Sequence, residues 1–266
     1  MSKITTSTLK AMKQAGNRFA SLTAYDATFA EIIEAAGVEV LLVGDSLGMV
    51  IQGHDSTLPV TLDEMIYHTK AVRQGTRDAL VMADMPFMSY NTEVQAVESA
   101  GRLMKEGGAN VVKLEGGRAL AGIIKQLTLF GIPVCAHLGL QPQSVHKLGG
   151  YKIQGRDEHA AKIILEDALA LEKAGADIVL LECVPMLLAE EVTRALDIPV
   201  IGIGAGPHCD GQVLVLQDML GITPGKRPRF TQDFLQGSNS IQDAIAAYAK
   251  AVKNGDFPTE QQSYTA

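Results

Sequence analysis

Short runs of consecutive apolar residues alternate along the chain with longer segments in which apolar residues recur every three or four positions. The short runs have the length and β-branched character of strands, whereas the longer segments have the period of amphipathic helices. A strand that is apolar at nearly every position, such as residues 178–181, must be covered on both faces, which is typical of a parallel sheet. Eight strands are predicted at residues 20–25, 40–44, 80–83, 111–114, 133–137, 178–182, 199–202 and 213–217.

The longer segments predict helices between and after these strands. Three of them lead into a glycine, Gly37, Gly107 or Gly175, where a left-handed residue commonly ends a helix. Eight βα units without a linker predict a (β/α)8 TIM barrel over residues 1–266, as a single domain with a short N-terminal helix and a C-terminal helical tail. A doubly wound open sheet would give the same strands and is the alternative. The predicted helices are residues 28–36, 62–77, 92–106, 119–129, 156–173, 186–196 and 240–253.

Composition limits the classes of protein that fit. The chain has 266 residues, of which 47% are hydrophobic, so it can bury a large core, and a disordered or collagen-like protein is excluded. With 23 Lys and Arg against 30 Asp and Glu, the net charge is −7. The one dense basic run, residues 226–229, is predicted to be a solvated loop before a helix. We therefore expect no nucleic-acid partner and no anionic membrane partner.

The cysteines and the hydropathy pattern indicate a location. Cys135, Cys183 and Cys209 are far apart and form no Cys-x-x-Cys pair, which suits a reducing compartment. No signal peptide is predicted, and no apolar stretch approaches the ~18 residues that a membrane span requires. We expect a cytoplasmic protein.

Polar residues stand where the predicted strands end. In either parallel architecture, ligands bind beyond the carboxyl ends of the strands, so these residues are candidates for chemistry. Four carboxylates gathered at one barrel mouth would repel one another, and a hard divalent cation would relieve that repulsion. Oxygen ligands without nearby Cys or His ligand spacing favour Mg²⁺ over zinc. The candidate residues are Asp45, Ser46, Asp84, Lys113, Glu115, His137 and Glu182.

Several of these residues also have a structural explanation. Asp45 and Asp84 could shape turns, because a glycine precedes the first and a Met-Pro pair follows the second. Lys113 and Glu115 lie two residues apart in one strand, so they share a face and could form a structural ion pair. Both interpretations remain open for all four residues.

The remaining candidates differ in how well a structural role explains them. His137 could equally be a core histidine or a site residue. Glu182 is flanked by apolar residues, which is unusual for a solvated carboxylate and indicates a general acid or base. The glycines of residues 202–206 lack dinucleotide-binding spacing and context, so they predict close backbone packing rather than a phosphate cradle.

Nine strings of the sequence resemble motifs of the ketopantoate hydroxymethyltransferase family. The resemblance runs from about Phe19 to Phe234, and strings of this length in this order are highly specific. The strings are TAYD (23–26), LVGDSLGM (42–49), QGHDSTLPVT (52–61), ADMPFM (83–88), VKLEGG (112–117), HLGLQPQ (137–143), GGYKIQGR (149–156), LECVP (181–185) and IGIGAG (201–206).

The resemblance implies a barrel of the phosphoenolpyruvate/pyruvate-utilising type and a specific reaction. A hydroxymethyl group passes from 5,10-methylenetetrahydrofolate to 3-methyl-2-oxobutanoate, giving 2-dehydropantoate and tetrahydrofolate in the first step of pantothenate synthesis. It implies one Mg²⁺ per subunit, folate as co-substrate, and a homodecamer. Carried over by motif, the metal residues are Asp45, Asp84 and Glu115, the oxoacid residues are Asp45, Ser46, Asp84, Lys113 and His137, and the proton acceptor is Glu182.

The residues agree with this chemistry. A 2-oxoacid can chelate Mg²⁺, which makes the adjacent C–H acidic, and Lys113 could stabilise the resulting enolate. Two other hypotheses remain at this point. One is a Mg²⁺-dependent C–C lyase or phosphonomutase of the same barrel group, and the other is a noncatalytic barrel that binds a small anion at residues 202–206.

Overall fold

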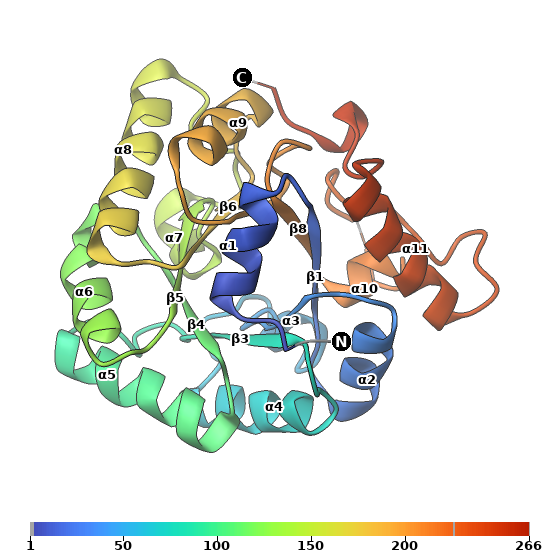
Figure 1. Ribbon diagram of the computed structural model, residues 1–266, viewed down its shortest axis with the longest axis horizontal. Helices are drawn as coiled ribbons and strands as arrows, with labels where there is room; N and C mark the ends of the chain where they lie inside the picture. Colours follow the sequence, from blue (N-terminus) through green and yellow to red (C-terminus); the bar gives the residue numbers. More distant parts are fainter. Residues whose placement is uncertain (1–2, 226, 266) are drawn as a thin grey trace.

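The computed structural model describes residues 3–225 and 227–265, and it contains a closed barrel of eight parallel strands in the order β1 to β8 (Figure 1). Each strand pairs with its sequence neighbours, and β1 pairs with β8 to close the barrel. The predicted barrel is therefore confirmed, and the open sheet is excluded. The strands are β1 (Phe19–Thr23), β2 (Val40–Val43), β3 (Leu80–Asp84), β4 (Val111–Glu115), β5 (Val134–Gly139), β6 (Ile178–Glu182), β7 (Val200–Ile203) and β8 (Gly211–Leu214).

Helices surround the barrel and cover the outer face of the sheet (Figure 1). Most begin at a side-chain cap: Asp26, Thr61 and Thr92 each accept a hydrogen bond from a backbone N–H of the first helical turn. The α-helices are α1 (Thr6–Gln14), α2 (Ala27–Ala35), α3 (Leu47–Val50), α4 (Leu62–Gln74), α5 (Glu93–Arg102), α6 (Ala121–Leu129), α7 (Val145–Leu148), α8 (Glu158–Ala174), α9 (Met186–Ala195), α10 (Leu216–Met219) and α11 (Ile241–Asn254). Among the described residues, no helix is both long and apolar enough to cross a bilayer.

Two local predictions were wrong. Gly107 does not end its helix in the left-handed region, because Leu103–Gly107 form a π-helical turn and Gly108 has the positive φ of 81° instead. The wider turn adds a residue, which moves the cap by one position. The last strand also lies earlier than residues 213–217, because the chain leaves the sheet after Leu214 and α10 begins at Leu216.

The end of the barrel where the strands begin is closed by α1 and by side-chain oxygens. Lys13 of α1 donates to Thr193 O at 2.7 Å and pairs with Asp210 at 2.9 Å. Acidic side chains at this end accept hydrogen bonds from backbone N–H groups at the starts of the strands. These N–H groups would otherwise be unpaired. The carboxylate–amide pairs with their distances are Glu39 with Ala20 N (2.9 Å), Glu34 with Asp78 N (2.6 Å), Asp177 with Val134 N (3.0 Å) and Asp210 with Val200 N (2.8 Å).

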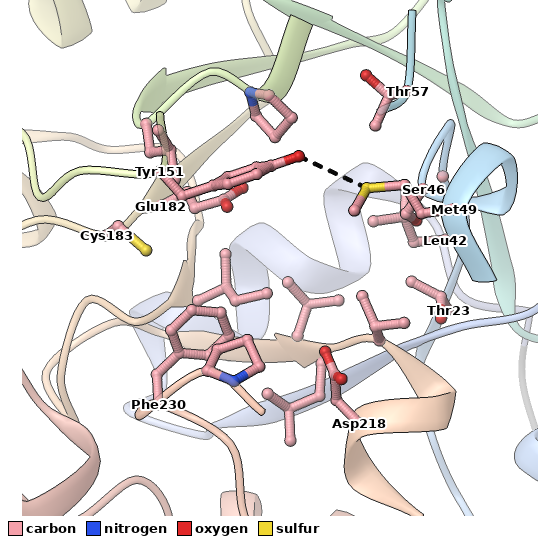
Figure 2. A pocket seen from close by; sticks show the side chains of 18 of the residues that line it. Thr23, Leu42, Ser46, Met49, Thr57, Tyr151, Glu182, Cys183, Asp218 and Phe230 are labelled. Carbon is pink, nitrogen blue, oxygen red and sulfur yellow. Dashed lines mark hydrogen bonds between the residues drawn. The ribbon is translucent and has the colours of Figure 1, made fainter. Parts of the chain in front are cut away.

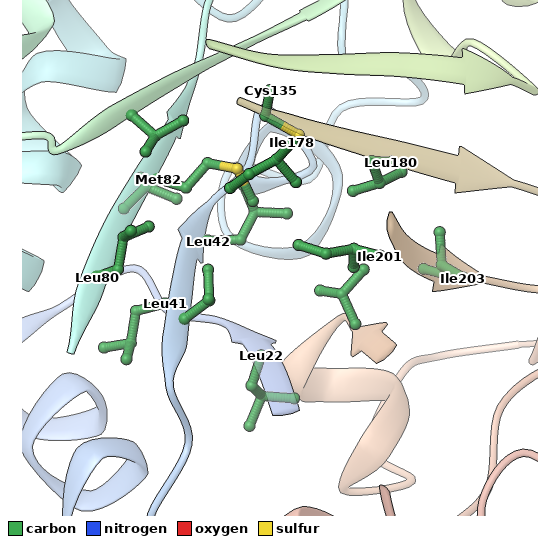
Figure 3. Close-up of a cluster of buried hydrophobic side chains, with 14 of the residues drawn as sticks. Leu22, Leu41, Leu42, Leu80, Met82, Cys135, Ile178, Leu180, Ile201 and Ile203 are labelled. Atoms are coloured by element: carbon green, nitrogen blue, oxygen red, sulfur yellow. The ribbon is translucent and has the colours of Figure 1, made fainter. Parts of the chain in front are cut away.

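The buried apolar cluster fills the barrel and the layer between sheet and helices (Figure 3). Six of the eight strands are buried along their whole length, and β5 and β6 are half-buried only at their last residue, as expected for a sheet covered on both faces. Leu42, Leu180 and Ile203 belong to this cluster and also line the cavity described below. The core therefore forms part of the wall of the site.

Tyr248 attaches α11 to the barrel. Its side chain is fully buried, and its hydroxyl donates to Ser21 O at 2.8 Å and Gln212 O at 3.0 Å, on β1 and β8. We expect Tyr248→Phe to lower the free energy of unfolding by about 1 kcal/mol, because the hydroxyl bonds are lost while the ring packing stays. Urea unfolding would measure this, with Tyr67→Phe, at an exposed ring, as the control. Equal stability of the two variants would contradict the role of the hydroxyl.

Candidate active site

A cavity of about 620 Å³ opens at the carboxyl ends of the strands (Figure 2). All seven candidate residues named from the sequence line it, and they come from β3 to β6 and from the turn after β2. The structure thus brings these residues together, as the strand-end argument predicts. The cavity has a polar end formed by these residues and a larger apolar part formed by the core and by loops.

Asp45 and Asp84 lie side by side in the polar end. The backbone N–H of Asp45 donates to Asp84 Oδ2 at 3.0 Å, and both residues are 3% exposed. Asp45 Oδ2 accepts from Gln143 Nε2 at 2.9 Å. Burial, together with repulsion from Asp84 and Glu115, raises the pKa of Asp45 well above its usual range. The two carboxylates therefore lack enough positive charge around them.

Lys113 is the ammonium group of this cluster. Its Nζ lies 2.9 Å from Asp84 Oδ1 and 3.3 Å from His137 Nδ1, and the residue is buried. Burial alone would lower the pKa of Lys113, but attraction to Asp84, Glu115 and Asp45 outweighs it and raises the pKa above its ordinary value. The side chain is consequently a fixed positive charge and a poor candidate for an amine nucleophile.

His137 joins two carboxylates. Its Nδ1 lies 3.4 Å from Glu115 Oε1, and its Nε2 lies 3.3 Å from Glu182 Oε2. Burial and the charge on Lys113 lower the pKa of His137, but the bonds to Glu115 and Glu182 raise it to about 9. His137 therefore lies in the cavity with a carboxylate on each side and is not an isolated core histidine.

Glu182 ends β6 at the cavity wall. Its backbone carbonyl accepts from Leu140 N at 2.8 Å, and the next residue, Cys183, has a positive φ of 47°. A positive φ is uncommon for a residue with a Cβ and is a strained conformation. Gly139 packs so closely against this strand end that a Cβ would lie 2.2 Å from Glu182 O. The backbone on both sides thus holds Glu182 facing the cavity.

Ser46 and Tyr25 form a second polar contact. Tyr25 Oη lies 2.9 Å from Ser46 Oγ, and burial raises the pKa of the Tyr25 phenol above its ordinary range. Gly44 permits this arrangement, because a Cβ there would lie only 2.7 Å from Ser46 Oγ. Tyr25 therefore stays a neutral hydroxyl that positions Ser46.

The polar end fits a divalent cation with few protein ligands. Four carboxyl groups line it beside one lysine and one histidine, so acidic groups outnumber basic ones. Asp45 Oδ1 has no hydrogen-bond partner in the part of the chain that the structure describes, and buried Asp84 Oδ1 is paired with Lys113 but accepts no hydrogen bond there. Mg²⁺ often takes only one or two carboxylates and completes its shell with water and substrate oxygens.

The third predicted metal residue is arranged differently. Glu115 lies in the same cavity, but Oε1 contacts His137 and Oε2 accepts from Gln143 N at 3.0 Å. Burial alone would raise the pKa of Glu115, yet these contacts lower it. Within the described ranges, no group of three or more His, Cys, Asp and Glu side chains forms a metal-binding cluster. Direct ligation by Glu115 stays a prediction.

Several residues of the site were not identified from the sequence. Gln143 joins Asp45 and Glu115, and Tyr151 lies over Glu182 with its hydroxyl directed at Met49 Sδ, 3.6 Å away (Figure 2). Gln143 lies in the short 3-10 helix Pro142–Ser144 and Tyr151 in a loop, so neither is at a strand end, although both fall within strings that resemble the family. Others that line the cavity include Thr23, Asp218, Phe230 and Tyr264.

The described part of the basic run lies in an exposed loop before a helix, as predicted, and it also borders the cavity. Arg227 and Arg229 are exposed and line the cavity, whereas Lys226 is outside the described residues. Arg229 lies over the ring of Tyr264 at 5.9 Å and donates to Gln261 O at 3.0 Å. These contacts hold the loop against the last part of the chain, which sequence patterns alone do not reveal.

The glycines of residues 202–206 provide close packing and not an anion cradle. An added Cβ would lie 2.9 Å from Cys209 Sγ at Gly202, 2.9 Å from the Phe230 ring at Gly204, and 2.4 Å from Met186 Cβ at Gly206. Side chains thus already occupy the space beside these residues. The expectation of close packing is confirmed, and the anion-binding hypothesis loses its main feature.

Comparison with known proteins identifies the family at the level of sequence. A family model described as ketopantoate hydroxymethyltransferase matches residues 3–260. A 3-methyl-2-oxobutanoate hydroxymethyltransferase of Nitrosococcus oceani is 59% identical and covers 99% of this chain and 100% of its own. The protein of the same description from Erwinia tasmaniensis is 57% identical, with coverage of 99% and 100%.

Solved structures support the fold. A phosphonopyruvate hydrolase has a TM-score of 0.62 at 14% identity, covering 83% of this chain and 84% of its own. A phosphoenolpyruvate phosphomutase from Streptomyces platensis subsp. rosaceus has a TM-score of 0.62 at 16% identity, with coverage of 82% and 83%. These similarities concern the barrel, whereas the family model and the relatives span almost the entire sequence. The chain belongs to the ketopantoate hydroxymethyltransferase family.

Proposed function

We propose that this protein is a hydroxymethyltransferase that moves a one-carbon unit from 5,10-methylenetetrahydrofolate to 3-methyl-2-oxobutanoate. The products are 2-dehydropantoate and tetrahydrofolate, in the first step of pantothenate synthesis. Relatives that are more than half identical over their full length bear the corresponding name. The observation that carries the proposal is the convergence of Asp45, Asp84, Lys113 and Glu182 in one cavity.

The polar end suits an α-ketocarboxylate. Asp45 and Asp84 would hold Mg²⁺, with Glu115 fixing the surrounding groups through His137 and Gln143. When bound, Mg²⁺ would supply Lewis acidity that polarises the keto group. Lys113 and Ser46 bind the oxygens of the oxoacid, and the ammonium group of Lys113 stabilises the negative charge that develops when the C3 proton leaves.

Glu182 accepts the proton in this proposal. It stands at the cavity wall across from the apolar part, and His137 Nε2 lies 3.3 Å from Glu182 Oε2, close enough to stabilise the ionised carboxylate when the imidazole is protonated. The C3 carbon then forms a bond to the methylene carbon of the folate as one of the two C–N bonds of the donor breaks with its electrons going to nitrogen. Water replaces the second nitrogen and supplies the hydroxyl oxygen, and both nitrogens end protonated in tetrahydrofolate. No covalent protein intermediate is required, which agrees with the persistent charge on Lys113.

Proton exchange tests the first half of the reaction without folate. In D₂O with Mg²⁺ and enzyme, 3-methyl-2-oxobutanoate is expected to lose its C3 proton signal by NMR, and a chelator should stop the loss. Adding 5,10-methylenetetrahydrofolate should then yield 2-dehydropantoate. A stable C3 signal together with no product would refute the proposal.

The other activities considered from the sequence are not favoured. The similarity to phosphonopyruvate hydrolase and to the phosphomutase is below 25% identity and reflects the fold. The hydroxymethyltransferase family, in contrast, matches along nearly the whole chain. As part of the proposal, we expect a homo-oligomer in the cytoplasm, a decamer by resemblance to the family.

A further inference from the structure

Asp218 is a buried carboxylate in the cavity that the proposed reaction does not yet use. It lies in the short helix α10 and is 7% exposed. Figure 2 shows its carboxylate pointing into the cavity from the wall opposite Tyr151 and Glu182. It lies beside apolar residues of the cavity wall, and its charge helps to raise the pKa of the Tyr25 phenol, which contacts Ser46 of the polar end. A carboxylate in such surroundings is costly unless a partner binds it.

The bonding of Asp218 is incomplete. Oδ1 accepts from Thr223 Oγ1 at 2.5 Å, while Oδ2 has no hydrogen-bond partner among residues 3–225 and 227–265. Burial raises the pKa of Asp218, and the Thr223 hydroxyl and the charge on Arg227 offset only part of that effect. A carboxylate has about four acceptor sites, so several remain available.

The backbone fixes this carboxylate before any ligand arrives. Thr23 Oγ1 accepts from Leu216 N at 2.8 Å at the start of α10, and Phe234 N donates to Met219 O at 2.9 Å at its end. Asp218 lies between these anchors. A buried acceptor that is held in place in this way can bind a ligand without loss of side-chain entropy.

We propose that Asp218 binds the pterin ring of the one-carbon donor and accepts hydrogen bonds from its N3–H and its 2-amino group. This inference rests on the proposed function, since it concerns the second substrate of that reaction. Two adjacent N–H donors on one planar edge match a carboxylate in the same way as a guanidinium does. The neighbouring walls, among them Val213, Leu214 and Phe230, are apolar and suit the faces of a flat ring.

The charge of Asp218 also sets the direction of binding. A carboxylate repels the oxoacid and the glutamate carboxylates of folate, so neither is expected to contact Asp218 itself. The neutral pyrimidinone edge is the part of the donor that can meet Asp218. The methylene group is then turned toward the oxoacid at the polar end, as bond formation requires.

Steady-state kinetics of Asp218→Asn test this role. The substitution keeps the shape of the side chain but replaces one acceptor oxygen with an NH2 group. This donor would face the N–H donors of the ring, so KM for 5,10-methylenetetrahydrofolate should rise about 10- to 100-fold. Exchange of the C3 proton of the oxoacid should stay within about twofold of the wild type, because that step occurs at the other end. The matched control is Thr223→Val, which removes the Oδ1 contact alone and should raise this KM less than about threefold.

A modified donor separates recognition from structural effects. Donor that lacks the 2-amino group should bind about tenfold more weakly than the normal donor to the wild type, and this preference should largely disappear in Asp218→Asn. An unchanged KM in Asp218→Asn, an effect equal to that of Thr223→Val, or a preserved preference for the 2-amino group would each overturn the assignment. If the wild type itself forms no 2-dehydropantoate, the proposed function fails instead.

Discussion

Glu182→Gln is expected to lower kcat about 10²- to 10⁴-fold, because the amide cannot accept the C3 proton while its shape still fits beside His137. The affinity for the oxoacid should change much less, since the metal end and Lys113 are untouched. NMR exchange in D₂O measures proton removal directly, and a coupled assay of 2-dehydropantoate measures complete turnover. Both rates should fall together.

The matched control is Glu191→Gln, at an exposed position on α9. It changes the same chemical group outside the cavity and should leave both rates within about twofold of wild type. Normal exchange in Glu182→Gln would remove Glu182 from proton transfer. A fall in turnover with unchanged exchange would place its role after the first step.

Asp84→Asn should weaken Mg²⁺ binding, and with it Mg²⁺-dependent oxoacid binding, by at least about 100-fold. The substitution removes one of two adjacent carboxylates and breaks the buried pair with Lys113, whose loss is worth about 3–5 kcal/mol in comparable sites. Calorimetric titration of Mg²⁺ into enzyme with and without oxoacid would measure the change.

Asp63→Asn is the control for this variant, because Asp63 forms an ion pair with Arg102 whose side chains are 78% and 43% exposed. Removing this ion pair should leave the Mg²⁺ affinity unchanged, since exposed ion pairs contribute little to the stability of the protein. A normal Mg²⁺ affinity in Asp84→Asn would show that the cation binds elsewhere and would contradict the two-carboxylate site.

The barrel could be predicted from the sequence because apolar residues are spaced differently in its strands and in its helices. Apolar runs such as residues 178–182 are too short for helices and match β6 at both ends, while segments such as α8 have clear helical spacing and a glycine cap at Gly175. The errors arose where hydrogen bonding departs from the regular pattern. The π-helical turn before Gly108 and the early end of β8 depend on tertiary packing that no local pattern encodes.

The candidate site was predictable to the extent that it lies on strands. Parallel topology carries the ends of β2 to β6 to one rim, so polar residues there converge irrespective of loop structure. Tyr151 and Asp218 reach the same cavity from a loop and from a short helix, and Gln143 contacts the cavity residues Asp45 and Glu115 from a short 3-10 helix. Their placement depends on contacts between distant segments, such as Gln143 with Asp45, which spacing along the chain cannot show.

The two rims of the barrel use acidic residues for separate purposes. At the strand starts, Glu34, Glu39 and Asp210 are engaged with backbone amides, whereas at the strand ends Asp45 and Asp218 keep acceptor atoms available. This separation favours the evolution of new activities. Residues at the strand-end rim can be substituted to suit a new reaction, while the contacts at the opposite rim continue to stabilise the barrel. A library that randomises only the strand-end loops should therefore yield many variants that fold but have lost activity, and few that aggregate.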